Sequence, residues 1–241
     1  MNTNIHTLSI QNRSAAGFSL IEMAIVLIVI ALLAGGMMLS LGTQQDIQRT
    51  NEVRRQLADI REALLGYAIA NGRLPPPADP TKANSDPMAG LIDEGRVSGV
   101  VPWVALGLPE TDPWGQRFTY RVRAEFADAI ALNTTPPCVL APGPTQSSFA
   151  LCSLGNISVT DGTVNIATVL PAIVVSHGKN GLGGYRTDGS QIAGSVGDEL
   201  ENANNDTSFV SRTHNATFDD ELTWIPLFNL LSRMVVAGRL P

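Results

Sequence analysis

The hydrophobic pattern opens with a long apolar run from Phe18 to Leu41, in which Glu22 is the only charged residue. At ~1.5 Å per residue, a helix of this length reaches about 36 Å, enough to cross a hydrocarbon core of ~30 Å. After this run, apolar residues continue mostly at three- and four-residue steps and form a single stripe. The residues of the stripe are Ile47, Val53, Leu57, Ile60, Leu64 and Tyr67. The pattern predicts one helix from Phe18 to about Ala70, apolar in its first half and amphipathic in its second, with Asn71-Gly72 as its end.

Four stretches farther along the chain have the pattern of β-strands. Residues 117–122 alternate polar and apolar side chains, and they follow an Asp-Pro-Trp-Gly sequence at 112–115 that is typical of a turn. Residues 172–176 include three consecutive β-branched residues, and 149–154 and 164–170 are the other two candidates. We expect an antiparallel sheet of about four strands that buries one face against the helical stripe, which is an α+β arrangement.

The remaining predictions concern the connections and the C-terminus. Residues 75–101 are rich in Pro, Asp and Gly and predict an irregular connector, with one short helical piece near 91–92. Residues 227–236 predict a short apolar helix, and Asp219 or Asp220 can cap a turn before it. This helix is too short to cross a membrane.

The residues in front of the apolar run form a polar leader, 1–17, without an acidic residue. In a secretory signal peptide, the small residues of the cleavage site follow the apolar region, which is then removed. Here the small residues, 15–17, come first, so cleavage after Gly17 would keep the helix and make Phe18 the new N-terminus. Gly17, Phe18 and Glu22, at the fifth position of the cleaved chain, resemble the class III leader of type IV pilins and type II secretion pseudopilins.

This resemblance implies a pilin-like fold with four parts. They are a leader peptide (1–17), a transmembrane and filament-core helix (18–41), the amphipathic second half of that helix (42–72) and a periplasmic globular α+β domain (73–241). The precursor would lie in the bacterial inner membrane as a single-pass protein with a cytoplasmic N-terminus. The Asp-Pro-Trp-Gly sequence at 112–115 also resembles a block of the major pseudopilins. The globular domain is larger than theirs, which favours a minor component.

The same resemblance implies processing and partners. A prepilin peptidase would cleave after Gly17, and the amine of Phe18 would be methylated. The subunits would then leave the lipid bilayer and join other pilin-like subunits at an inner-membrane assembly platform. Glu22 would pair with the Phe18 amine of a neighbouring subunit, which offsets the burial of both charges. The alternative is that Glu22 lies near the lipid headgroups, where a carboxylate in the first helical turn suits the helix dipole. One chain does not separate a type II secretion pseudopilus from a type IV pilus.

Composition narrows the classes of partner. The net charge is −6 and the chain has no long basic run, so we expect no nucleic-acid partner. The two cysteines, Cys138 and Cys152, are not arranged as a metal-binding pair. In an oxidising compartment they can form a disulfide, which would contribute roughly 3 kcal/mol by restricting the unfolded chain. The alternative is two buried free thiols.

Candidate chemistry is sparse. The glycine-rich stretch 176–184 lacks phosphate-loop spacing because Lys179 is followed by Asn180, and His177 has no nucleophile signature beside it. The acidic loop 188–206 is rich in oxygen ligands, and the resemblance to major pseudopilins makes calcium a possible occupant there. No spacing fixes its ligands, and a solvated loop is the alternative. We therefore expect no enzyme and no cofactor, the rival being a membrane-anchored periplasmic enzyme or ligand-binding domain.

Overall fold

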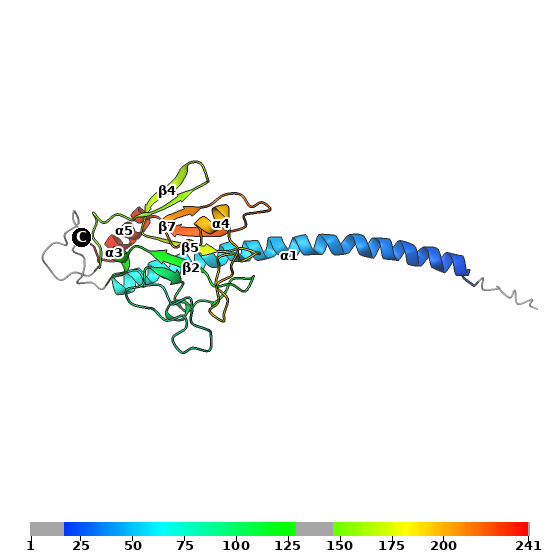
Figure 1. Ribbon diagram of the computed structural model, residues 1–241, viewed down its shortest axis with the longest axis horizontal. Coiled ribbons are helices and arrows are strands. Elements are labelled where there is room, and N and C mark those ends of the chain that lie inside the picture. The colour runs from blue at the N-terminus through cyan, green and yellow to red at the C-terminus, as the bar shows by residue number, and fades with distance from the viewer. Residues whose placement is uncertain (1–16, 129–146, 241) are drawn as a thin grey trace, which may run out of the picture. The chain divides into compact units, whose positions relative to one another are not determined.

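The computed structural model describes residues 17–128 and 147–240, except the side chains of 34–41 and 43. The contacts divide the chain into two units, Met1–Ile47 and Gln48–Pro241. The helices and strands are shown in Figure 1. In chain order they are α1 (Leu20–Asn71), β1 (Ser98–Val100), α2 (Trp103–Leu106), β2 (Thr119–Val122), α3 (Ala124–Ala127), β3 (Ile157–Thr160), β4 (Asn165–Leu170), β5 (Ala172–Ser176), α4 (Gly197–Glu201), β6 (Ser208–Val210), β7 (Glu221–Ile225) and α5 (Leu227–Val236).

The long N-terminal helix predicted from the hydrophobic pattern is confirmed as α1. It ends at Asn71, and the next residue, Gly72, has a φ of 72°, a conformation that glycine adopts without strain. The Gly72 amide donates to the carbonyl of Ala68 at 2.8 Å and so closes the last turn. Among the described residues, we find no helix that has both the length and the apolar character for a membrane crossing. The transmembrane role of 18–41 stays a prediction.

A four-stranded antiparallel sheet, in the order β1-β2-β5-β7, forms the centre of the second unit. All five residues of β5 are buried. Because successive side chains of a strand point to opposite faces, Val174 packs in one apolar cluster, while Ile173 and Val175 pack in another. Both faces of this sheet are therefore covered.

The first face packs against the second half of α1, as the helical stripe predicts. Figure 1 shows β2, β5 and β7 alongside one another, next to that part of α1. The apolar side chains at this interface come from three sources: Val53, Leu57, Ile60 and Leu64 of α1, Tyr120, Val122, Val174 and Ile225 of the sheet, and Leu227, Leu230 and Met234 of α5. Burying a side chain of this kind contributes about 1.5–3 kcal/mol, so this interface strongly stabilises the second unit.

The second face is covered by another sheet, in the order β4-β3-β6. Its buried residues Ile157, Val159 and Phe209 pack against Ile173 and Val175 of β5. The pair β3–β4 is antiparallel, and the pair β3–β6 is parallel. A helical layer, a central sheet and an outer sheet together confirm the α+β class.

Two local predictions were wrong, and a third is confirmed as a strand but not as part of the central sheet. Residues 149–154 form no strand, because Ser153 donates its amide to the carbonyl of Ala150 and accepts the Ala150 amide at its hydroxyl, both at 3.0 Å, which closes a turn. Residues 164–170 do form a strand, β4, but it belongs to the outer sheet. Residues 91–92 lie in no helix, and the short helix of this region is α2. The strands that complete the central sheet, β1 and β7, were not predicted.

Candidate functional site

The N-terminal end of α1 is closed by a reciprocal pair of contacts between Ser19 and Glu22. The Glu22 amide donates to the Ser19 hydroxyl at 3.2 Å, and the Ser19 amide donates to the Glu22 carboxylate at 3.5 Å. This is a capping box, in which a Ser and a Glu three residues later satisfy two backbone amides at a helix start. The Ser-x-x-Glu spacing signals it in the sequence, but the sequence interpretation did not use Ser19.

The helix that follows this cap exposes apolar side chains in the first unit. Phe18 is 78% exposed and Leu20 is 92% exposed. Other large exposed apolar side chains of this helix are Ile21, Met23, Ile25, Val26, Leu27, Ile28, Val29, Ile30, Leu32 and Leu33. An apolar surface of this extent marks a site that lipid or other protein chains cover.

The predicted disulfide falls partly outside the described residues. Cys138 belongs to the segment 129–146, and Cys152 is exposed in the turn that precedes β3. The pairing of the two cysteines stays a prediction.

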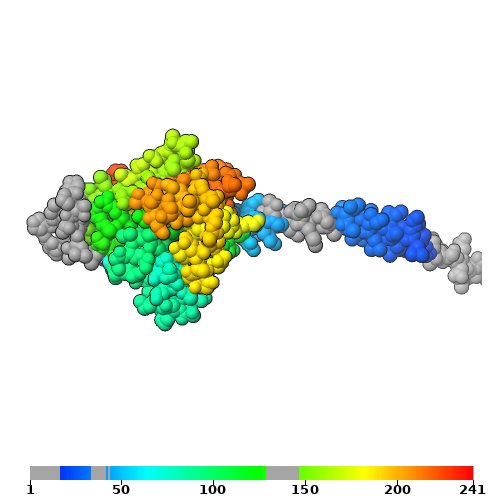
Figure 2. Space-filling model, viewed as in Figure 1, coloured from blue at the N-terminus to red at the C-terminus, as the bar shows by residue number. Residues whose placement is uncertain are grey.

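A compact group of carboxylates lies in the second unit, between the end of β5, α4 and the start of β7. Oxygen atoms of Glu199, Asp219 and Asp220 lie within 4.8 Å of one another, and Glu199 and Asp220 are each 2% exposed. Figure 2 shows the segment after β5 (yellow) beside the segment around α4 (orange) on one face of this unit. The pairing of β5 with β7 explains why these segments lie close together. Ser176 pairs with Glu221, which brings the neighbouring residues His177 and Asp220 together.

Each carboxylate is held in place through one oxygen atom. Asp219 Oδ2 accepts the backbone amides of 179 and 180 at 2.9 and 3.0 Å. Asp220 Oδ2 accepts the side-chain amide of Asn202 at 2.8 Å, and Glu199 Oε1 accepts that of Asn180 at 2.8 Å. The other oxygens of the two aspartates, both Oδ1 atoms, are buried without a hydrogen-bond partner among the described residues.

His177 adjoins this cluster and is 0% exposed. Its Nε2 atom lies 2.8 Å from the hydroxyl of Thr119, whereas its Nδ1 atom lies 3.7 Å from Asp220 Oδ1 and has no hydrogen-bond partner within the described parts of the chain. Burial lowers the pKa of His177 to about 4 and raises the pKa of Asp220 to about 8. At neutral pH the imidazole is therefore uncharged.

Two sequence predictions change here. Of the acidic loop 188–206, only Glu199 joins the cluster, because Asp188 binds the amide and hydroxyl of Ser190 and Asp198 pairs with Arg212 at 2.7 Å. Asp219 and Asp220 do not cap a turn before the last helix, because their Oδ2 atoms bind the amides of 179 and 180 and of Asn202. The residue at the start of α5 is Pro226, and no side chain in the described part of the chain caps it. The prediction was wrong because β7 separates the two aspartates from α5.

The Asp-Pro-Trp-Gly sequence is a structural turn, as predicted. Asp112 Oδ1 accepts the amides of Trp114 and Gln116 at 2.9 and 3.0 Å, and Oδ2 accepts the hydroxyl of Ser176 at 2.7 Å. Asp112 is 4% exposed. The turn is thereby fixed to the end of β5, directly before His177.

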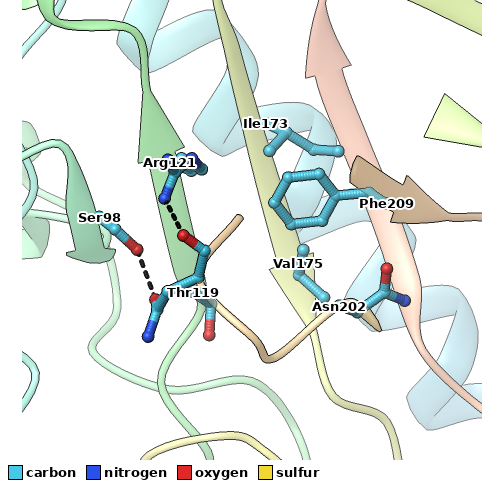
Figure 3. Close-up of a pocket in the computed structure, with 8 residues that line it drawn as sticks. Ser98, Thr119, Arg121, Ile173, Val175, Asn202 and Phe209 are labelled. Atoms are coloured by element: carbon cyan, nitrogen blue, oxygen red, sulfur yellow. Dashed lines mark hydrogen bonds between the residues drawn. The ribbon is translucent and has the colours of Figure 1, made fainter. Parts of the chain in front are cut away.

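Thr119 also lines a small cavity (Figure 3). Its lining includes Thr119, Arg121, Asn202 and Phe209, and its volume is about 10 Å³. Asn205 closes one side, where its carbonyl accepts from Arg121 at 2.6 Å. A cavity of this size holds one water molecule. The series Thr119, His177 and Asp220 has the residue types of a catalytic triad, but this cavity has no room for a substrate beside Thr119.

Comparison with protein families places a known motif at the N-terminus. Residues 12–38 match the family model described as the prokaryotic N-terminal methylation motif, which is the class III signal of type IV pilins and pseudopilins. The match covers a small part of the chain and does not extend to the second unit. Comparisons with curated proteins and with solved structures give no significant match.

Proposed function

We propose that this chain, whose N-terminus carries the methylation signal of type IV pilins and pseudopilins, is a minor structural subunit of a type II secretion pseudopilus or a type IV pilus. The observation that carries the proposal is the order of the signal: small residues at 15–17, then Phe18, then Glu22 within an apolar run. A tethered enzyme needs no processing in front of its anchor. The signal therefore favours a structural subunit over an anchored enzyme.

Assembly through the N-terminal helix follows from its exposed apolar surface. Before assembly, the lipid of the inner membrane covers these side chains, and the second unit lies on the periplasmic side. In the filament, the helices of other subunits replace the lipid, and Glu22 pairs with the Phe18 amine of a neighbour. A prepilin peptidase and an inner-membrane assembly platform are the partners that this route requires.

Processing is the direct test. We expect mass spectrometry of the protein extracted from membranes to show a methylated Phe18 as its first residue. Gly17→Asp should block cleavage. A Cβ atom at position 17 would meet nothing within 4 Å, so the effect of this substitution would come from the peptidase and not from misfolding of this chain.

The control for this experiment is a substitution at Ser19, which is also exposed but follows the cleaved bond. Ser19→Ala should be cleaved normally. Recovery of an intact Met1 leader from cells with an active prepilin peptidase would refute the proposal.

We also propose that Cys138 and Cys152 form one intramolecular disulfide in the periplasm, because the chain has two cysteines and the proposed compartment is oxidising. Peptide mapping without a reductant should recover a single linked peptide pair. Two thiols that react with an alkylating agent in unreduced protein would contradict the pairing. Replacement of both cysteines by serine should lower the free energy of unfolding by roughly 3 kcal/mol.

A further inference from the structure

The carboxyl groups of Glu199, Asp219 and Asp220 are crowded together at a buried site. Their oxygen atoms lie within 4.8 Å of one another, and two of the three side chains are almost completely buried. Because burial keeps a proton on Asp220 at neutral pH, the cluster is not fully charged without a metal ion, and a bound cation would replace that proton. The amide groups that hold the cluster fix the orientation of the carboxylates.

The buried imidazole of His177 independently indicates a ligand-binding position between this ring and the carboxylates. Its Nδ1 atom and the nearest oxygen, Asp220 Oδ1, are 3.7 Å apart, and neither has a hydrogen-bond partner in the described part of the protein. Unpaired polar atoms are expensive to bury, and two such atoms that face each other leave a gap for a shared ligand. A cation satisfies both atoms at once.

The contact on the other side of the ring fits a metal-binding histidine. His177 Nε2 lies 2.8 Å from the Thr119 hydroxyl, which can accept an N–H from that nitrogen. A proton on Nε2 leaves the lone pair of Nδ1 free to bind a metal ion. Histidine ligands commonly donate their second ring N–H to a fixed acceptor, which sets the tautomer and the ring orientation.

We propose that His177, Glu199, Asp219 and Asp220 bind one divalent transition-metal ion, Zn²⁺ or Mn²⁺. Carboxylate oxygens together with one imidazole nitrogen suit these ions, whereas calcium takes six to eight oxygen ligands. Ligands of a zinc ion lie ~2.0–2.2 Å from it in a tetrahedral arrangement, so neighbouring ligand atoms are about 3.3–3.6 Å apart. The 3.7 Å between His177 Nδ1 and Asp220 Oδ1 is close to this spacing, whereas the oxygens of the three carboxylates, within 4.8 Å of one another, would have to close in on the ion.

The ion would join three segments that are distant in the sequence. His177 follows β5, Glu199 lies in α4, and Asp219 and Asp220 precede β7. In the folded protein the ion would fix the loop that contains α4 to the edge of the central sheet. Its expected effect is therefore on the stability of the second unit.

Thermal unfolding of the full chain in detergent, stripped with EDTA, tests the proposal. At concentrations about 100-fold above Kd, Zn²⁺ or Mn²⁺ should raise Tm by about 5 to 10 °C, because only the folded chain presents the complete site. Elemental analysis after dialysis should find one ion per chain. Unchanged melting with both ions, or a rise with Ca²⁺ alone, would overturn the proposal.

Two conservative substitutions locate the site. Asp220→Asn and Glu199→Gln should each remove the metal-dependent rise in Tm. Asp188→Asn is the matched control, since Asp188 is an exposed acidic residue that binds only within its own turn. It should keep the full response. A rise in Tm that persists in both site variants would place binding elsewhere and refute this site.

Discussion

Replacing Glu22 by Ala should leave a cleaved, stable, membrane-associated protein that no longer assembles. The substitution makes the helix more apolar, so insertion should be kept or improved. In a filament, however, the Phe18 amine of the neighbouring subunit would lose its carboxylate. Leaving one member of a buried pair uncompensated costs about 3–5 kcal/mol, which lowers an assembly constant by a factor of hundreds or more. In vivo crosslinking to pilin-like partners, beside a secretion or piliation assay and with the protein level as control, measures the loss.

The capping box supplies variants that separate the two roles of Glu22. Glu22→Gln keeps a side chain that can cap the helix but removes the charge. Ser19→Ala opens the cap, at a cost of about 0.5–2 kcal/mol, and keeps the carboxylate. If Glu22 pairs with an amine, Glu22→Gln should fail to assemble and Ser19→Ala should assemble. The reverse result would make Glu22 a capping residue only.

Replacing Arg117 by Ala should cause the largest loss of stability in the second unit. The side chain is 0% exposed, and its guanidinium donates to the carbonyls of Pro80, Lys82 and Thr187 at 2.6–3.1 Å and to the carboxylate of Glu110 at 2.7 and 3.0 Å. The substitution would remove these five hydrogen bonds and the charge partner of Glu110, and, in the part of the chain that the structure describes, the Thr187 carbonyl would keep only the Asn84 amide as its donor. We expect a loss of about 3–5 kcal/mol in the free energy of unfolding, and a drop of roughly 6–20 °C in Tm.

Arg117→Lys and Arg121→Ala are the controls for this prediction. Lysine keeps the charge but lacks the planar fork of donors, so it should recover only part of the loss. Arg121 lies four residues farther along the chain, in β2, where it is partly exposed and, among the described residues, donates to a single carbonyl, that of Asn205. Its replacement should cost no more than about 1.5 kcal/mol. Equal effects for Arg117→Ala and Arg121→Ala would contradict the role given to Arg117.

The elements that the sequence predicted are those whose signals are local. The stripe from Val53 to Leu64 repeats at helical spacing, and Gly72 supplies the conformation that ends the helix, so α1 can be identified without its partners. The apolar stretches of β5 and α5 matched the observed bounds for the same reason. The N-terminal signal is also local, because Gly17, Phe18 and Glu22 lie within a few residues of one another.

Pairing between distant segments was decided by the tertiary structure. β7 has the sequence Glu-Leu-Thr-Trp-Ile. It forms a strand because residues 221–225 pair with the edge of β5 that β2 does not occupy. The same register places Asp220 beside His177, although some forty residues separate them. Arg117 looks like an exposed strand residue until the connector at 80–82 and the loop at 187 close over it. The hydrophobic periodicity of the sequence indicates only which face of an element is buried. Which residues contact that face depends on how segments that are distant in the sequence come together in the fold.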